Sequence, residues 1–249
     1  MSEAETKPNP PGIERATLTS QIVDRLKKRI LDGVLVSGDR IWAAQLAEEF
    51  GTSIIPVKEA LLVLQAENFI TNVPRRGSII RRFTRLEMEE LYDLREMIEI
   101  EALRRARATG TLDDSLIQSL TECNERIGAL REKGGFSDQA AAFELDRRFH
   151  DILVGASGHR ALADWYTRLN QHVQIIRYAS WNIGPRGDKT YNEHARIVEA
   201  VARGDIGRCK SAVSGHLTSI RRDFRKTLDS GSMAGGEFVG GRRSAGSVK

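Results

Sequence analysis

Residues 52–82, TSIIPVKEALLVLQAENFITNVPRRGSIIRR, determine the predicted fold of the N-terminal part of the chain. Thr52 and Ser53 can cap a helix, because their side-chain oxygens accept hydrogen bonds from the first free backbone N–H groups. The helical pattern then gives way to two short strands, 69–73 and 78–82, joined by a turn that contains proline and glycine. The stretch therefore predicts a helix followed directly by a basic β-hairpin.

Two more short helices are expected before this stretch. The segment 21–33 is amphipathic, with Thr19 or Ser20 as its cap and Gly33 as its end, and a second helix should cover 43–50. The third helix should turn inward the apolar residues Val57, Leu61, Leu62 and either Leu64 or Gln65. Three short helices followed by a small β-hairpin are typical of a winged helix-turn-helix, whose recognition helix enters the major groove of DNA.

Everything after Phe83 has helical periodicity. Thr84 and Glu87 can form a capping box at the start of the first long helix, since each side chain can bond the other residue's backbone. The expected helices cover 84–109, 111–133, 138–154, 160–180, 191–203 and 206–228. This pattern predicts an all-α antiparallel bundle of about six helices, and the whole chain is expected to be mainly α.

The composition divides the chain into four segments. We expect a flexible arm over 1–16, a winged helix-turn-helix domain over 17–83, an all-α domain over 84–230, whose ligand and metal binding are considered below, and a disordered tail over 231–249. The formal net charge of +4 permits nucleic-acid binding without demonstrating it. The sequence contains no long apolar run and no secretory signal pattern, so we expect a cytoplasmic protein without a membrane span.

Candidate DNA contacts lie at the start of the third helix and at the turn of the hairpin. Residues at the N-terminus of such a helix reach base edges, and its free N–H groups can hold a phosphate. The candidates are Thr52, Ser53, Ile55 and Lys58 on the helix and Arg75, Arg76 and Gly77 on the turn. Arg81 and Arg82, behind the turn, fit a DNA role and an ordinary solvated surface equally well.

All five histidines lie in the predicted helical bundle. Asp146 and His150 are spaced i, i+4 and share a helix face, while His194 and His216 each align with apolar residues of their own helices. Four such side chains from three helices could surround one cation in the bundle core. The alternative is that each histidine is an ordinary hydrogen-bonded core residue. We keep that interpretation for the two remaining histidines, His159 and His172.

The sequence resembles the GntR family of bacterial transcription regulators, in the subclass with an FCD-type effector domain. The N-terminal resemblance rests on LAEEFG, on TSIIPVKEAL at the third helix and on PRRGSII at the hairpin. Ile54 and Lys58 stand where the family pattern Ser-Arg-Thr-Pro-Val-Arg-Glu-Ala-Leu has arginine. An isoleucine cannot make the bidentate hydrogen bonds of a guanidinium, so we expect either another operator sequence or weaker binding.

The C-terminal resemblance continues to about residue 228 and rests on DRRFH, SG, EH, GD and HL, which begin at residues 146, 157, 193, 204 and 216. It implies that a divalent metal is bound by Asp146, His150, His194 and His216. Nitrogen-rich ligation with one carboxylate suits zinc or nickel, with manganese or iron as alternatives. An open coordination position would then take the carboxylate of a small organic acid.

Arg95 has two interpretations. At i, i+4 spacing it could be the surface ion-pair partner of Glu99. The resemblance implies instead that it faces the ligand pocket, where its guanidinium would bind the effector's carboxylate. The resemblance also implies a homodimer on a palindromic DNA operator. We therefore expect a ligand-responsive transcription regulator in which residues 82–84 connect the ligand-sensing helical domain to the DNA-binding domain.

Two other classes of protein remain open at this point. A helical metal-dependent hydrolase or lyase would use the open metal position to activate water and would need a nearby base. Glu193 is adjacent to His194 but is expected to point elsewhere, and the sequence contains no HExxH motif. The second class is an interaction module that no longer binds DNA. Ile54 suggests it, because this residue stands where the family pattern has an arginine.

Overall fold

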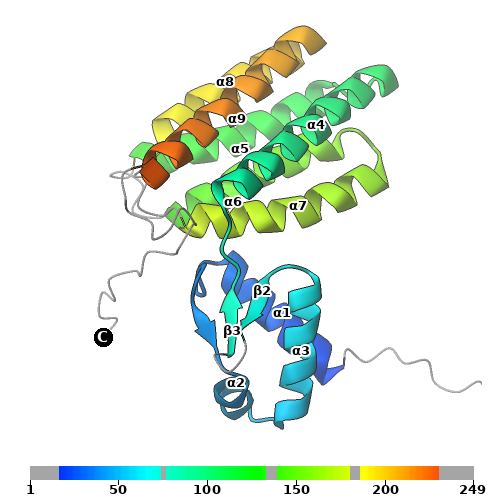
Figure 1. Cartoon of the computed structure of the whole chain (residues 1–249). Helices are drawn as coiled ribbons and strands as arrows, with labels where there is room; N and C mark the ends of the chain where they lie inside the picture. Colours follow the sequence, from blue (N-terminus) through cyan, green and yellow to red (C-terminus); the bar gives the residue numbers. More distant parts are fainter. Residues whose placement is uncertain (1–16, 74–76, 133–138, 180–185, 230–249) are drawn as a thin grey trace, which may run out of the picture.

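The structure is a computed structural model that describes residues 17–73, 77–132, 139–179 and 186–229. Figure 1 shows a small head of three helices and a sheet, with a larger helical bundle above it. The head contains α1 (Leu18–Leu31), β1 (Arg40–Ile41), α2 (Ala43–Glu49), α3 (Ile54–Ala66), β2 (Ile70–Val73) and β3 (Gly77–Ile80). The bundle contains α4 (Arg85–Thr109), α5 (Asp114–Glu132), α6 (Gln139–Gly155), α7 (Arg160–Ala179), α8 (Gly187–Ala202) and α9 (Ile206–Asp229). The expected mainly α fold with a winged-helix head is confirmed.

The helices of the head follow the predicted order but differ from the prediction in two details. Thr17 caps α1, not Thr19 or Ser20, and its side chain accepts a hydrogen bond from the Ser20 backbone N–H. Leu62 is 61% exposed, so its predicted inward orientation is wrong. Leu62 lies about 100° around the helix from Leu61, on the side away from Val57 and Leu64, and therefore faces solvent. The buried positions of α3 are Val57, Ala60, Leu61 and Leu64.

The sheet of the head has one strand more than the predicted hairpin. Its order is β1-β3-β2, and all neighbouring strands are antiparallel. β1 is only two residues long and therefore leaves no alternating pattern in the sequence. Gly77 opens β3 with a φ of 76°, and a Cβ there would lie 2.8 Å from the carbonyl oxygen of Ile41. Only glycine fits this close approach of backbone to backbone.

The bundle begins with the predicted capping box. The Thr84 side chain accepts from the Glu87 N–H, and the Glu87 side chain accepts from the Thr84 N–H. α4 packs against α9, α6 and α7, while α5 packs against α6 and α8. This arrangement brings α6, α8 and α9 to the same interior around α4. None of the helices in the described ranges is long and apolar enough to cross a membrane.

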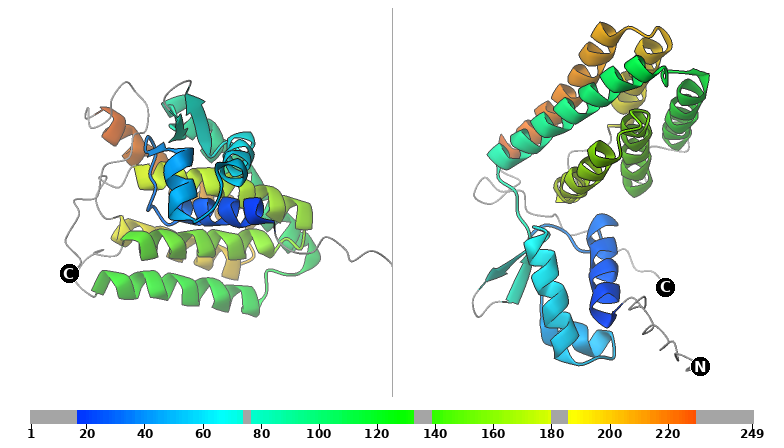
Figure 2. Two further views of the ribbon diagram at one scale, coloured as in Figure 1. Left: turned by 90° about the horizontal axis from the view of Figure 1, so that it is seen from below. Right: turned by 90° about the vertical axis from the view of Figure 1, so that its right-hand side faces the viewer.

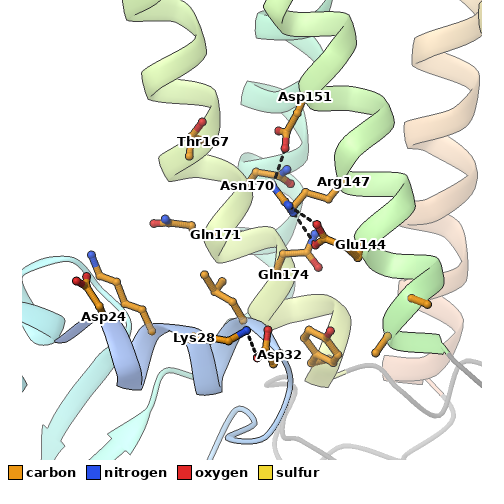
Figure 3. A pocket seen from close by; sticks show the side chains of 15 residues that line it. Asp24, Lys28, Asp32, Glu144, Arg147, Asp151, Thr167, Asn170, Gln171 and Gln174 are labelled. Carbon is orange, nitrogen blue, oxygen red and sulfur yellow. Dashed lines mark hydrogen bonds and ion pairs between the residues drawn. The ribbon is translucent and has the colours of Figure 1, made fainter. Parts of the chain in front are cut away.

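The head and the bundle contact each other through α1, α3 and α7. The right-hand view of Figure 2 shows the single linker that joins them before α4. His172 of α7 lies with Nε2 3.0 Å from the carbonyl oxygen of Glu67, the residue that ends α3, and its ring packs against Phe69 and Phe83. A cavity of about 770 Å³ is lined by residues of α1, α6 and α7 (Figure 3).

Gly33, at the end of α1, lies against the ring of Tyr178 on α7. Its φ is 69°, and a Cβ would overlap the tyrosine ring. We expect Gly33→Ala to lower the free energy of unfolding by more than the ~1–2 kcal/mol cost of the left-handed backbone alone, because the ring must also move. Gly110→Ala is the matched control, since its φ is 77° and nothing lies within 4 Å. Equal losses in urea denaturation would show that the head–bundle contact adds nothing.

Candidate metal centre and nucleic-acid interface

The four predicted metal ligands converge in the bundle. α6 supplies Asp146 and His150, α8 supplies His194 and α9 supplies His216, and one ligand atom of each lies within 4.8 Å of the other three. All four side chains are at most 1% exposed. Residues up to 70 positions apart in the sequence are therefore brought together by the packing of helices and not by local structure. The alternative of unrelated core histidines does not fit this convergence.

Two of the histidines are oriented by carboxylates outside the cluster. His150 Nδ1 lies 2.9 Å from Glu99 Oε2, and His216 Nδ1 lies 2.9 Å from Glu193 Oε2. Both histidines are neutral, because burial lowers their pKa, and an ionised carboxylate can only accept. The single proton of each imidazole therefore sits on Nδ1. Each Nε2 is left with a lone pair that points into the cluster.

These lone pairs face each other without a proton between them. His150 Nε2 and His216 Nε2 are 3.1 Å apart, and neither can donate. His194 Nε2 lies 3.5 Å from Asp146 Oδ1, and neither atom makes a hydrogen bond of good geometry within the described chain. Burial lowers the pKa of His194 to about 4, so it is neutral as well. One carboxylate and three neutral imidazoles that converge in a buried site fit a divalent cation.

Asp146 and Glu99 stay ionised although both are buried. Burial alone would raise the pKa of Glu99, but His150 and Arg95 lower it to about 2. Burial opposes ionisation of Asp146 too, and the Arg177 guanidinium, whose Nη1 donates to Asp146 Oδ2 at 2.5 Å, holds its pKa well below the usual range. The cluster therefore offers a metal one carboxylate oxygen and three imidazole nitrogens.

Arg95 lies inside the bundle next to this cluster. It is 0% exposed, its Nε donates to Glu99 Oε1 at 2.8 Å, and its Nη2 lies 3.8 Å from Asp146 Oδ2. Arg95 pairs with Glu99, as the spacing predicts. The interpretation that places this ion pair on the surface is wrong, because both side chains are buried. Neither Nη1 nor Nη2 has a hydrogen-bond partner within the described chain. A buried guanidinium with free donors can bind a carboxylate.

Several residues of the centre were not predicted from the sequence. Glu193 was expected to point elsewhere, yet it accepts a hydrogen bond from His216, because α9 approaches α8 on that side. Glu99, Arg177 and Tyr166, which donates to Glu99 Oε1 at 2.9 Å, were not identified as members either. Two of them had a local signal, Glu193 in its position beside His194 and Glu99 in its i, i+4 spacing from Arg95. His159 and His172 lie outside the cluster and bond to nearby groups, as predicted, but both are half-buried and neither is a core residue.

The predicted DNA contacts at the start of α3 lie on an open face of the head. Ser53, Ile55 and Lys58 are exposed at the start of α3, and Thr52 is half-buried beside them. Ser53 has the extended backbone of an N-cap, but its side chain makes no capping hydrogen bond, so it remains available. Arg75 and Arg76 lie outside the described residues.

The residues that follow the hairpin hold the junction of head and bundle. Arg81 Nη2 donates to Glu87 Oε1 at 2.5 Å, and its guanidinium stacks over Phe83. Arg81 therefore has a structural role at the start of α4.

A winged-helix head joined to an all-helical domain defines a class of DNA-binding transcription regulators. Residues 18–80 match the family model for bacterial regulatory proteins, gntR family, and residues 90–219 match the FCD domain. The chain belongs to the gntR family of transcription regulators and carries an FCD domain. The enzyme alternative is wrong, since both models and the curated relatives are those of transcriptional regulators.

The relatives cover most of the chain at low identity. An HTH-type transcriptional regulator of Bacillus subtilis, YdhC, is 26% identical over 211 residues, which cover 85% of this chain and 92% of that protein. The gluconate operon transcriptional repressor of Bacillus licheniformis is 29% identical, covering 75% and 74%. The solved structure of Escherichia coli McbR/YncC has a TM-score of 0.70 at 21% identity, covering 86% and 99%. It supports the fold alone.

Proposed function

We propose that this regulator binds one divalent cation through Asp146, His150, His194 and His216 and senses a small organic acid there. The convergence of four buried ligand atoms within 4.8 Å of one another carries the proposal, and the 3.1 Å separation of His150 Nε2 and His216 Nε2 supports it. Three nitrogens and one oxygen favour zinc or nickel over manganese or iron. When bound, the cation would act as a Lewis acid that attracts the carboxylate of the effector.

The effector is proposed to be a carboxylate because of Arg95. Its free Nη donors lie beside the cluster, so one acid group could bind both the cation and the guanidinium. One relative is the repressor of the gluconate operon, and gluconate is itself a carboxylate. This likeness supports the class of effector without identifying it.

Signal transfer is proposed to run along α6 to the head. α6 carries the ligands Asp146 and His150, and it also lines the cavity that faces α1 with Glu144, Arg147 and Asp151. Arg147 donates to both of these carboxylates (Figure 3). A shift of α6 on effector binding would change this wall and the position of the head. In a homodimer, such a shift changes the spacing of two recognition helices on a palindromic operator.

DNA contact is proposed for Thr52, Ser53, Ile55, Lys58, Arg75, Arg76 and Gly77. Their positions at the start of α3 and around the hairpin turn support this assignment. The proposal covers a double-stranded operator and a cytoplasmic homodimer, with the domain limits expected above.

The DNA-binding part of the proposal is tested by fluorescence anisotropy with DNA flanking the protein's own gene. We expect affinity to fall steeply with salt and Lys58→Ala to reduce the slope of log Kd against log salt by about one per lost phosphate contact. Lys210→Ala, an exposed lysine of α9, is the matched control and should leave the slope unchanged. Absence of binding at low salt would support a module that has lost DNA binding.

A further inference from the structure

Two consecutive isoleucines are exposed at the start of the recognition helix. Ile54 is 39% exposed and Ile55 is 65% exposed, whereas Val57 in the same turn is fully buried. Neither isoleucine belongs to the hydrophobic core or packs against it. The fold of the head therefore does not explain why these positions are apolar.

The first turn of α3 points away from the bundle. The opposite end of the helix contacts α7, since the carbonyl of Glu67 lies 3.0 Å from His172 Nε2. In helix-turn-helix proteins the N-terminal residues of the recognition helix contact base edges. Ile54 and Ile55 therefore occupy the positions nearest to the bases, between the polar side chains of Ser53 and Lys58.

The chemistry of these side chains restricts which base they can face. In the major groove the thymine 5-methyl is the apolar group of the base edges, whereas guanine, cytosine and adenine present donors and acceptors. An isoleucine against a polar edge would remove water from it without replacing the lost hydrogen bonds. Against a thymine methyl, the same side chain buries apolar surface from both partners.

We propose that Ile54 and Ile55 read thymine methyl groups, so that each operator half-site carries A·T pairs opposite the first turn of α3. This inference rests on the proposed DNA contacts and adds their sequence preference. Ser53, Lys58 and the helix N–H groups then hold the phosphates, while the isoleucines select the base.

The test starts with selection of double-stranded DNA from a random library by the full-length protein. We expect thymine to be enriched at fixed positions of both half-sites. In the selected site, each of these thymines is then replaced by deoxyuridine, which lacks only the methyl group. Each replacement should weaken binding roughly fourfold, the value of one buried methyl-sized group.

Two variants separate this readout from general damage. Ile54→Ala/Ile55→Ala should bind thymine and deoxyuridine DNA equally, whereas Val34→Ala should still discriminate between them. Val34 is 64% exposed and sits at the end of α1 that contacts α7. Equal affinity of the wild type for thymine and deoxyuridine DNA, or a selected site without thymine, would overturn the methyl readout alone. Failure to enrich any sequence would overturn the proposed operator binding as well.

Discussion

Replacement of His194 with alanine should reduce the bound metal from about one divalent ion per chain to nearly none. Neither ring nitrogen of His194 has a protein hydrogen-bond partner of good geometry within the described chain, so removal of the imidazole breaks no such bond. Its ring stacks on Phe149 at a centroid distance of 3.9 Å, which fixes its orientation toward Asp146. Elemental analysis of the purified full-length proteins measures the change.

The control for this substitution is His159→Ala. His159 lies at the start of α7, where Nδ1 accepts from the Leu162 N–H at 3.2 Å, and it is not part of the cluster. The control should keep the wild-type metal content. A chelator should also lower the melting temperature of the wild type but not of His194→Ala, because an ion at a thousand times its Kd contributes about 4 kcal/mol. Unchanged metal content in His194→Ala would contradict the assignment of His194 as a ligand.

Arg95→Met should lower the free energy of unfolding by about 3–5 kcal/mol, because one partner of a buried ion pair is removed and the other stays buried. Arg95 and Glu99 are both 0% exposed, and Glu99 also orients His150. Without the guanidinium, the Glu99 carboxylate loses a hydrogen bond and a compensating charge. Urea denaturation at constant metal concentration measures the loss.

The matched control is Arg104→Met on the same helix. Arg104 pairs with Glu101 at i, i+3, but its side chain is 60% exposed, so solvent screens the pair and the expected loss is much smaller than for Arg95→Met. Similar losses in the two variants would mean that the Arg95 pair contributes no more than a surface pair. Arg95→Lys tests whether Arg95 binds the effector, since lysine keeps the positive charge but cannot donate two parallel hydrogen bonds to one carboxylate. It should weaken thermal stabilisation by added carboxylates such as gluconate.

The convergence of Asp146, His150, His194 and His216 could be predicted because each residue left a trace in its own helix. Asp146 and His150 share a face through their spacing, and His194 and His216 align with apolar neighbours; the family resemblance then joined them. The carboxylates that orient the histidines left weaker traces, namely the position of Glu193 beside His194 and the spacing of Glu99 from Arg95. Glu99 is 51 residues from His150, and only the packing of α4 on α6 brings them together.

The fold was predicted to the level of helices and strands, and its errors have local causes. Leu62 was assigned to the core because apolarity alone does not distinguish two neighbouring leucines, although only Leu61 faces inward. β1 escaped prediction because two residues cannot show alternation. Glu193 was misjudged because its partner His216 belongs to another helix, so its direction depends on tertiary packing.

The most direct measurement of the central claim is X-ray absorption at the edge of the metal that co-purifies with the full-length protein. A single site bound by Asp146, His150, His194 and His216 predicts three imidazole nitrogens and a carboxylate oxygen, all at about 2.0–2.2 Å. A spectrum with sulfur ligands or with fewer than three imidazoles, or a protein without any stoichiometric metal, would contradict it.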